Sequence, residues 1–184
     1  MSAIDDEEVG TPHRLVPALT LLILAVSLVT IYQGWHDQAF YDLMRRNPDR
    51  LHQGEWWRIA SPLLVDRDKI LLQVPNFLGI LIFGTAIERS AGRLWMLTAF
   101  LAGGIAGQLA AYAWAPPGAG NSVAMLGLAG CALIAFTRPA RAILATAAIL
   151  TAIYFTYHQD MHGPAALAGI AVGLLIMLRD STSR

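Results

Sequence analysis

Charge and cysteine are both scarce in this sequence. Only 14% of the 184 residues are charged, and 13 basic residues balance 13 acidic ones, so the formal net charge is zero. A chain without a basic excess has no electrostatic basis for binding nucleic acid. The single cysteine, Cys131, excludes an intramolecular disulfide and a metal site built from several thiolates. It lies within an apolar stretch, and we expect it to be a small packing residue.

The alternating pattern of a half-buried strand is also missing, and long apolar runs take its place. Hydrophobic residues make up 55% of the chain and the mean hydropathy is +0.50, which is typical of a multi-pass membrane protein. A spanning helix needs roughly 20 mainly apolar residues. We therefore predict an all-α polytopic membrane protein, folded as a compact six-transmembrane-helix bundle, because backbone groups in lipid must be hydrogen-bonded internally. The six predicted helices cover residues 15–32, 70–87, 94–114, 122–136, 140–157 and 164–178.

These segments predict how the chain is divided. We expect an N-terminal tail over residues 1–14, a membrane domain over residues 15–178 with a long first loop at 34–69, and a C-terminal tail over residues 179–184. The N-terminus is acidic, unlike the basic start of a secretory signal, so we interpret the first apolar run as a retained helix. The short tails and the lack of a transit-peptide pattern favour a bacterial plasma (inner) membrane.

The distribution of Lys and Arg predicts an orientation. The connections between the third and fourth and between the fifth and sixth helices contain neither residue, so the positive-inside rule places both termini in the cytoplasm. Basic residues on the predicted cytoplasmic side are Arg89, Arg93, Arg138, Arg141, Arg179 and Arg184. The first loop is basic as well and conflicts with this orientation. Its aromatic residues, Phe40, Tyr41, Trp56 and Trp57, favour a folded element that lies at the membrane interface.

Three polar residues fall where the helix order predicts the outer ends of three helices. Ser122 begins the fourth helix after a loop rich in Pro and Gly, Asn76 lies near the start of the second, and His162 precedes the sixth. Each has a structural explanation, as a helix cap, an interhelical hydrogen bond or part of a solvated loop. Together they supply a nucleophile, an oxyanion donor and a base. A serine nucleophile needs an adjacent base, and its tetrahedral intermediate needs donors such as the Ser122 N–H and the Asn76 amide.

The loop before the sixth helix carries His158, Asp160 and His162 in alternation. Two imidazoles and a carboxylate could in principle bind a metal ion. Alternate residues share a face on a strand and not in a short loop, and no fourth ligand is evident, so we favour a solvated loop and predict no metal site.

Several motifs, in this order and with this topology, resemble those of the rhomboid family of intramembrane serine proteases, in its six-helix bacterial form. The resemblance covers nearly the whole chain. It rests on Gly54-Glu-Trp-Trp-Arg58 in the first loop, Asn76 with Gly84 and Glu88, Gly103-Gly104-Ile-Ala-Gly107, Gly120-Asn-Ser122 with Gly127, and Gly169-Ile-Ala-Val-Gly173. The resemblance implies hydrolysis of transmembrane substrates by a Ser–His dyad without metal or cofactor. It implies Ser122 as nucleophile, and Asn76 with the Ser122 N–H as oxyanion donors.

The position of the base depends on how the sixth helix is aligned with the family. If Gly169 and Gly173 are its two small residues, the base position falls on Ala166. If Ala165 and Gly169 are the small residues, the base is His162, one turn or about 5 Å further out. Three other positions depart from the family pattern, namely Val123 after the serine, Leu126 one turn later and Leu72 four residues before Asn76.

Two functions remain open from the sequence. The first is an active intramembrane serine endopeptidase with Ser122 and His162 as its catalytic pair. The alternative is a catalytically inactive pseudoprotease that binds transmembrane segments in the same groove. In either case we expect transmembrane proteins and the lipid bilayer as partners and no nucleic acid, and the sequence does not determine the oligomeric state. A channel is disfavoured because no charge lies well within a predicted span.

Overall fold

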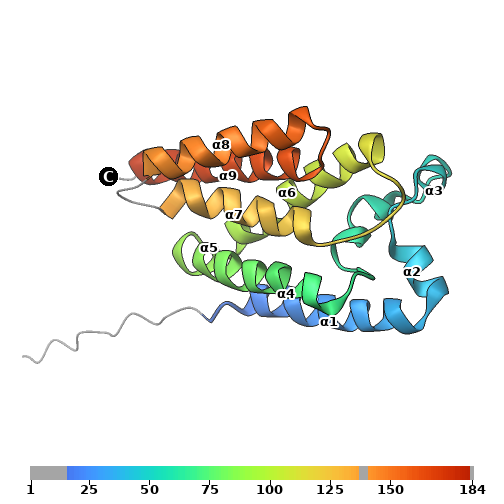
Figure 1. The fold of residues 1–184 in the computed structure, drawn as a ribbon. Coiled ribbons are helices and arrows are strands. Elements are labelled where there is room, and N and C mark those ends of the chain that lie inside the picture. Colours follow the sequence, from blue (N-terminus) through green and yellow to red (C-terminus); the bar gives the residue numbers. More distant parts are fainter. Residues whose placement is uncertain (1–15, 137–140, 183–184) are drawn as a thin grey trace, which may run out of the picture.

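The computed structural model describes residues 16–136 and 141–182, and these residues form an all-helical bundle without strands (Figure 1). The six predicted spans are all helical, which confirms the predicted fold class. They are α1 (Ala18–His36), the continuous segment α4–η3–α5 (Ile70–Gly79, Ile80–Gly84 and Thr85–Ser90), α6 (Arg93–Trp114), α7 (Ser122–Phe136), α8 (Arg141–Tyr157) and α9 (His162–Thr182). The predicted tail over residues 1–14, the predicted helix starts at Leu15 and Ala140, and the basic residues Arg138 and Arg184 lie outside the described residues.

Length and apolar composition make this chain an integral membrane protein. Four of the helical segments are long and apolar enough to cross a bilayer: α1, Ile70–Ser90, α6 and α9. The other two, α7 and α8, are shorter apolar helices. The middle of the second span, Ile80–Gly84, has π-helical hydrogen bonding, which the sequence did not indicate.

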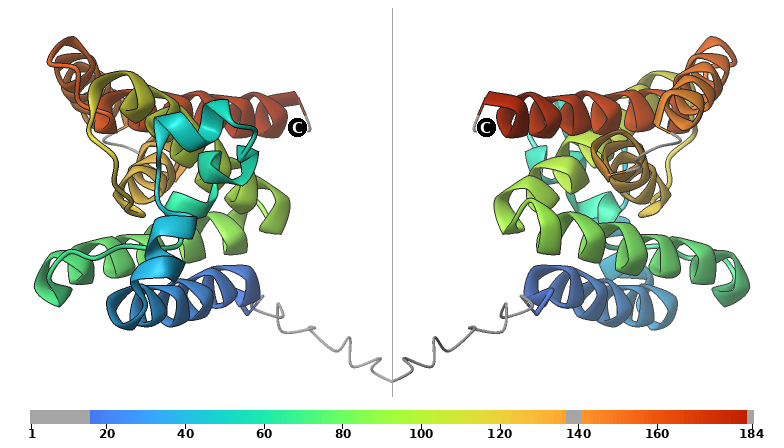
Figure 2. Two further views of the ribbon diagram at one scale, coloured as in Figure 1. Left: turned by 90° about the vertical axis from the view of Figure 1, so that its right-hand side faces the viewer. Right: turned by 90° about the vertical axis from the view of Figure 1, so that its left-hand side faces the viewer.

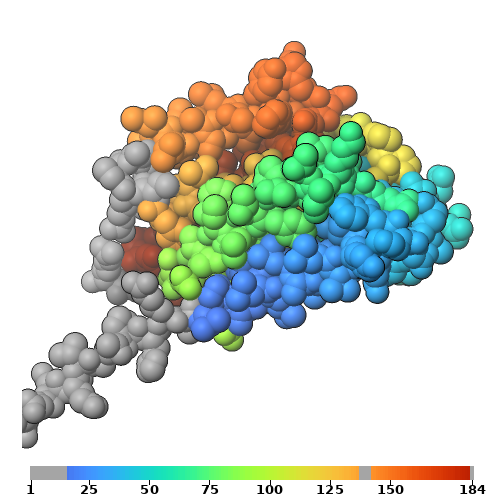
Figure 3. Space-filling view, turned by 60° about the horizontal axis from the view of Figure 1, so that its bottom comes forward, coloured from blue at the N-terminus to red at the C-terminus, as the bar shows by residue number. Residues whose placement is uncertain are grey.

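Helix α7 is the centre of the bundle. Nine of its 15 residues are buried, and it packs most extensively against α9 and α6. Figure 2 shows α7 between α9 on one side and the α4–α5 segment on the other. In Figure 3, α1, the α4–α5 segment and α8 follow one another across one face of the molecule. Ser122 is the first residue of this central helix.

Small residues allow the backbones of α6, α7 and α9 to approach one another. A Cβ atom added at Gly127 would lie 2.6 Å from the Cα atom of Gly103 on α6, and one added at Gly130 would lie 2.7 Å from the carbonyl oxygen of Ala166 on α9. Real Cβ atoms do not approach other atoms so closely. Cys131 is fully buried in the same helix, as expected for a packing residue.

The α1 helix is joined to the end of the second span by a buried carboxylate. Glu88 is only 1% exposed and accepts hydrogen bonds from the backbone N–H groups of Leu19 and Thr20 at 3.0 and 2.8 Å. The Thr20 hydroxyl donates a third bond at 2.8 Å. These donors belong to the first turn of α1, where N–H groups have no intrahelical partner. Glu88 therefore has a structural role on the side opposite Ser122.

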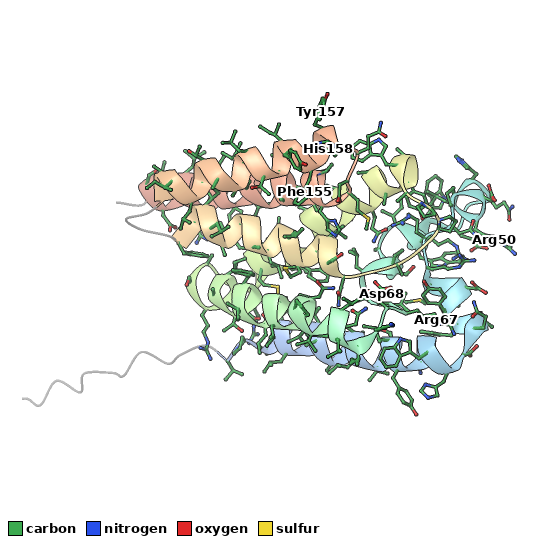
Figure 4. The ribbon with its side chains drawn as sticks, viewed as in Figure 1. Arg50, Arg67, Asp68, Phe155, Tyr157 and His158 are labelled. Atoms are coloured by element: carbon green, nitrogen blue, oxygen red, sulfur yellow. The ribbon has the colours of Figure 1, made fainter. Side chains whose placement is uncertain are left out.

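The first loop begins at residue 37, because α1 continues to His36, and it is folded as predicted. It contains α2 (Gln38–Met44), α3 (Pro48–His52) and the short 3₁₀ turns η1 (Trp56–Ile59) and η2 (Ser61–Leu63). The buried Arg58 side chain donates to the carbonyl oxygens of Asp42 and Arg45 at 2.7 and 2.8 Å. In Figure 4 this loop forms one end of the molecule, with Arg50, Arg67 and Asp68 on it. The Trp56 and Trp57 side chains are exposed, which suits contact with a membrane interface.

Candidate active site

Ser122 and His162 are the first residues of α7 and α9, and their side chains contact each other. The Oγ atom of Ser122 lies 2.9 Å from Nε2 of His162, which is hydrogen-bonding distance. Both side chains are partly buried. The residue of α9 that contacts Ser122 is thus His162. Ala166 lies one helical turn deeper, as the spacing requires.

Small residues in the two turns of α9 that follow His162 allow α9 to pack closely against α7. Ala165, three residues after His162, is fully buried. Gly169, seven residues after it, has no room for a side chain, because an added Cβ atom would overlap the carbonyl group of Gly127. Close packing at these positions places the start of α9 beside the start of α7. The imidazole can therefore reach Ser122 directly.

The loop that precedes Ser122 is fixed by a glycine and by the first loop. Gly120 has a φ angle of +148°, a conformation that favours glycine, and its N–H donates to the Pro62 carbonyl oxygen at 2.9 Å. Val123, the residue after the serine, is fully buried. A Cβ atom added at Gly107 of α6 would lie 2.6 Å from the Cβ atom of Val123. The valine side chain therefore fills the space at Gly107.

Asn76 lies at the depth of Ser122. Helices α4 and α7 run in the same direction (Figure 1), and Gly79 packs directly against the Met125 side chain. Asn76 precedes Gly79 by three residues on α4, and Ser122 precedes Met125 by three residues on α7. Because the helices are parallel, Asn76 and Ser122 lie at the same level. Asn76 is half-buried, whereas Gln73, on the preceding turn, is fully buried. The face of α4 that is turned toward the bundle thus carries two amides.

The Ser122 N–H is a second donor at this end of the bundle. The first four N–H groups of a helix have no acceptor within it, and their dipoles favour negative charge at the N-terminus. Because Ser122 is the first residue of α7, its own N–H belongs to this group. A negatively charged oxygen bound near the serine would meet this N–H.

Asp160 contacts the other nitrogen of the imidazole. Its Oδ1 atom lies 2.6 Å from Nδ1 of His162 and accepts the His162 backbone N–H at 2.9 Å. The expectation that this loop is merely solvated is therefore wrong for Asp160. It holds for His158, which is exposed and labelled in Figure 4 just after the C-terminal end of α8. The interpretation of His162 as a base beside Ser122 stays a prediction, and the contact between the two side chains supports it. Among the described residues, no group of three His, Cys, Asp or Glu side chains is arranged to hold a metal ion.

A mainly apolar cavity of about 300 Å³ lies between α7, α8 and α9, and His162 is one of its lining residues. Small side chains such as Ala129, Ala148 and Ala166 line it together with large apolar ones such as Leu126 and Phe155. Its volume is at the lower end of the range typical of ligand sites. The imidazole thus has a polar contact with Ser122 and an apolar space beside it.

A family model described as "Rhomboid domain" matches residues 53–182, which is more than half of the chain. The chain belongs to the rhomboid family. Rhomboid proteins form a family of intramembrane proteases, so the sequence resemblance is confirmed. The matched region contains Asn76, Ser122, Asp160 and His162, and it leaves out α1 and the start of the first loop.

Two curated rhomboid proteins from Bacillus subtilis (strain 168) are similar to this chain. The rhomboid protease GluP is 36% identical over 126 residues, which are 67% of this chain and 25% of GluP. The putative rhomboid protease YdcA is 28% identical over 139 residues, which are 69% of this chain and 66% of YdcA. The chain therefore spans a quarter of the length of one relative and about two thirds of the other.

Sequence reasoning missed one polar partner in this rhomboid site. The alternation of His158, Asp160 and His162 suggests a role for Asp160 only as a metal ligand. The signal was its spacing, since an acidic residue two positions before a histidine at a helix start can reach both the backbone N–H and the ring. A carboxylate there leaves the far ring nitrogen free for another helix.

Proposed function

We propose that this protein is an intramembrane serine endopeptidase that hydrolyses peptide bonds in or near transmembrane segments of membrane proteins. The observation that carries this proposal is the 2.9 Å contact between Ser122 Oγ and His162 Nε2. A serine hydroxyl is a weak nucleophile unless a base takes its proton. An imidazole at this distance, on a different helix from the serine, is such a base.

The reaction follows from this contact. The Ser122 hydroxyl transfers its proton to Nε2 of His162 while Oγ bonds to the scissile carbonyl carbon. The carbonyl oxygen becomes an oxyanion, which the Ser122 N–H and the Asn76 amide stabilise by hydrogen bonds. His162 then gives the proton to the leaving nitrogen, and the C–N bond breaks. A water molecule, deprotonated by His162, releases the acyl group and restores the hydroxyl.

The substrates that suit this site are helices in the bilayer that unwind locally. A peptide bond inside an intact helix is shielded by its hydrogen bonds, and unpaired backbone groups are costly in lipid. The cavity beside His162 suits an apolar side chain next to the scissile bond. We place the protein in a bacterial plasma membrane with both termini in the cytoplasm, as the positive-inside rule predicts, and Ser122 and His162 near the outer face.

The alternative is a pseudoprotease that binds transmembrane segments without cutting them. The family departures at Leu72, Val123 and Ala166 favoured it on sequence grounds. The proximity of Ser122 and His162 favours the protease instead, because a binding groove has no need for a paired hydroxyl and imidazole.

Cleavage of a model single-pass substrate by the purified protein in lipid vesicles tests the proposal. We expect the wild-type protein to cleave, and we expect Ser122→Ala and His162→Ala each to reduce the rate at least about 10³-fold. Ser181→Ala and His158→Ala are matched controls, since both residues are exposed, and they should cleave normally. A wild-type protein that binds the substrate helix but never cuts it would support the pseudoprotease.

A further inference from the structure

We propose that Asp160 is a positioning residue for His162, so that this protein uses a Ser122–His162–Asp160 triad in place of a dyad. The inference rests on the roles proposed above for Ser122 and His162. It is drawn from the contacts that the two nitrogen atoms of the His162 imidazole make. Nε2 lies 2.9 Å from Ser122 Oγ, and Nδ1 lies 2.6 Å from Asp160 Oδ1. Polar contacts therefore fix the ring at both ends.

The carboxylate determines which ring nitrogen carries the proton. An ionised carboxylate only accepts hydrogen bonds, so Nδ1 must be the donor, and the lone pair of the neutral ring is left on Nε2. That lone pair is the one directed at Ser122. When the serine proton moves to Nε2, the ring becomes an imidazolium next to a carboxylate, and this charge pair favours the transition state. Asp160 itself takes no proton.

The backbone around Asp160 is held by the end of α8. Gln159 has a φ angle of +57° and is the only non-glycine residue with positive φ in the part of the chain that the structure describes. The N–H of Gln159 donates to the Thr156 carbonyl oxygen at 3.0 Å, and the N–H of Asp160 donates to that of Phe155 at 2.9 Å. This pair of bonds is the Schellman motif that ends many helices. It anchors Asp160 to α8 while its carboxylate binds the start of α9.

The simpler explanation is that Asp160 only caps α9. A cap accounts for the bond from the His162 backbone N–H, but it requires no contact with the ring. Asn caps a helix about as well as Asp, so Asp160→Asn retains the cap and removes the charge. If Asp160 only caps α9, this variant should cleave substrate at the wild-type rate. If Asp160 positions His162, the variant should cleave more slowly.

The expected size of the effect follows from the exposure of the carboxylate. In soluble triad proteases the equivalent substitution lowers kcat roughly 10⁴-fold, where the carboxylate is buried. The Asp160 side chain is 39% exposed, so water screens its charge. We therefore expect Asp160→Asn to lower kcat about 10- to 100-fold, with KM and the melting temperature near their wild-type values.

The experiment compares the wild-type protein with Asp160→Asn, Asp160→Ala and the control His158→Asn, all reconstituted with the model substrate. A kcat loss in Asp160→Asn, with KM retained and the control normal, supports the triad. Cleavage that depends on Ser122 but is normal in Asp160→Asn overturns the triad and leaves the proposed function intact.

A second measurement does not require turnover. The imidazole ¹⁵N NMR spectrum of His162 should show one neutral tautomer, protonated on Nδ1, and Asp160→Ala should give a mixture of tautomers. If the protein cleaves nothing, this spectrum still tests the ring position independently of the proposed function. An unchanged tautomer in Asp160→Ala would refute the positioning role.

Discussion

Gly169 of α9 lies directly against the backbone of Gly127 of α7, with no space for a side chain between them. Gly127 is five residues after Ser122 and Gly169 is seven residues after His162, and the contact between them sets the separation of the two helices that carry the paired side chains. The geometry of the site therefore depends on a residue that has no functional group.

Gly169→Val should separate α9 from α7. The branched side chain would overlap the Gly127 carbonyl group, and a displacement of about 1 Å at a catalytic pair can cost about 100-fold in rate. We expect substrate cleavage to fall by at least that factor. Ala171→Val is the matched control, because Ala171 is exposed on the same helix. Equal activity of the two variants would contradict the role of this contact.

Arg46→Lys should loosen the loop that leads to Ser122. The buried Arg46 guanidinium donates to the Gln108 side chain and to the Pro116 carbonyl oxygen, both at 2.8 Å. A lysine ammonium lacks the planar fork that reaches both acceptors. We expect the unfolding free energy to fall by about 1 kcal/mol and kcat to fall several-fold. The comparison is Arg45→Lys, at a more exposed neighbouring position, which should change neither quantity by much.

Ala148→Phe should fill the cavity beside His162. Ala148 on α8 is among the residues that line it, so the added ring would occupy the space proposed for a substrate side chain. We expect KM to rise for substrates with a large apolar residue next to the scissile bond, and less so for substrates with alanine there. Ile149→Phe adds bulk at an exposed position and serves as the control. If both substrates respond equally to Ala148→Phe, the cavity does not select the side chain.

Asp66→Asn should change how stability depends on pH. Burial raises the pKa of the Asp66 carboxyl above its ordinary value of 3.8. Since the folded state favours the protonated form, this group's contribution to stability is present below that value and is lost as the pH rises through the raised pKa. The asparagine variant should lack this loss and be relatively more stable at neutral pH.

Thermal unfolding of the wild-type protein and Asp66→Asn from about pH 4 to pH 7 checks this expectation. Asp49→Asn is the control, because Asp49 is an exposed carboxylate of the same loop. The asparagine at position 66 can still accept the Asp68 N–H, which the Oδ1 atom of Asp66 binds at 2.9 Å. Parallel pH profiles for the wild-type protein and Asp66→Asn would contradict the expectation.

The helices were predictable from the sequence because the lipid environment leaves few alternatives. A run such as Ser122–Phe136 is apolar throughout and follows a Pro/Gly loop, so its start and its end were both predicted. The π-helical turn at Ile80–Gly84 was not predicted, because it depends on which backbone groups pair with each other within an otherwise uniform apolar run. The short helices of the first loop were also missed, because they are held by distant contacts such as those of Arg58.

The candidate site was only partly predictable. The sequence indicated Ser122, Asn76 and His162, but two alignments of the sixth helix were equally defensible. Ala165, Gly169 and Gly173 are all small and are four residues apart, so sequence spacing alone could not assign the base. Packing decides which residue of α9 reaches Ser122, because that depends on the depth at which Gly169 meets Gly127. Asp160 was missed because its alternation with two histidines suggests only a metal ligand, although its spacing from His162 indicated the contact.

The central claim is that the His162 imidazole activates the Ser122 hydroxyl. Labelling with a fluorophosphonate, followed by mass spectrometry of the labelled peptide, measures this directly and needs no natural substrate. We predict that the wild-type protein carries one label on Ser122, and that labelling is lost in Ser122→Ala and reduced at least about 100-fold in His162→Ala. A wild-type Ser122 that resists the reagent, or one that reacts equally fast without His162, would contradict the account.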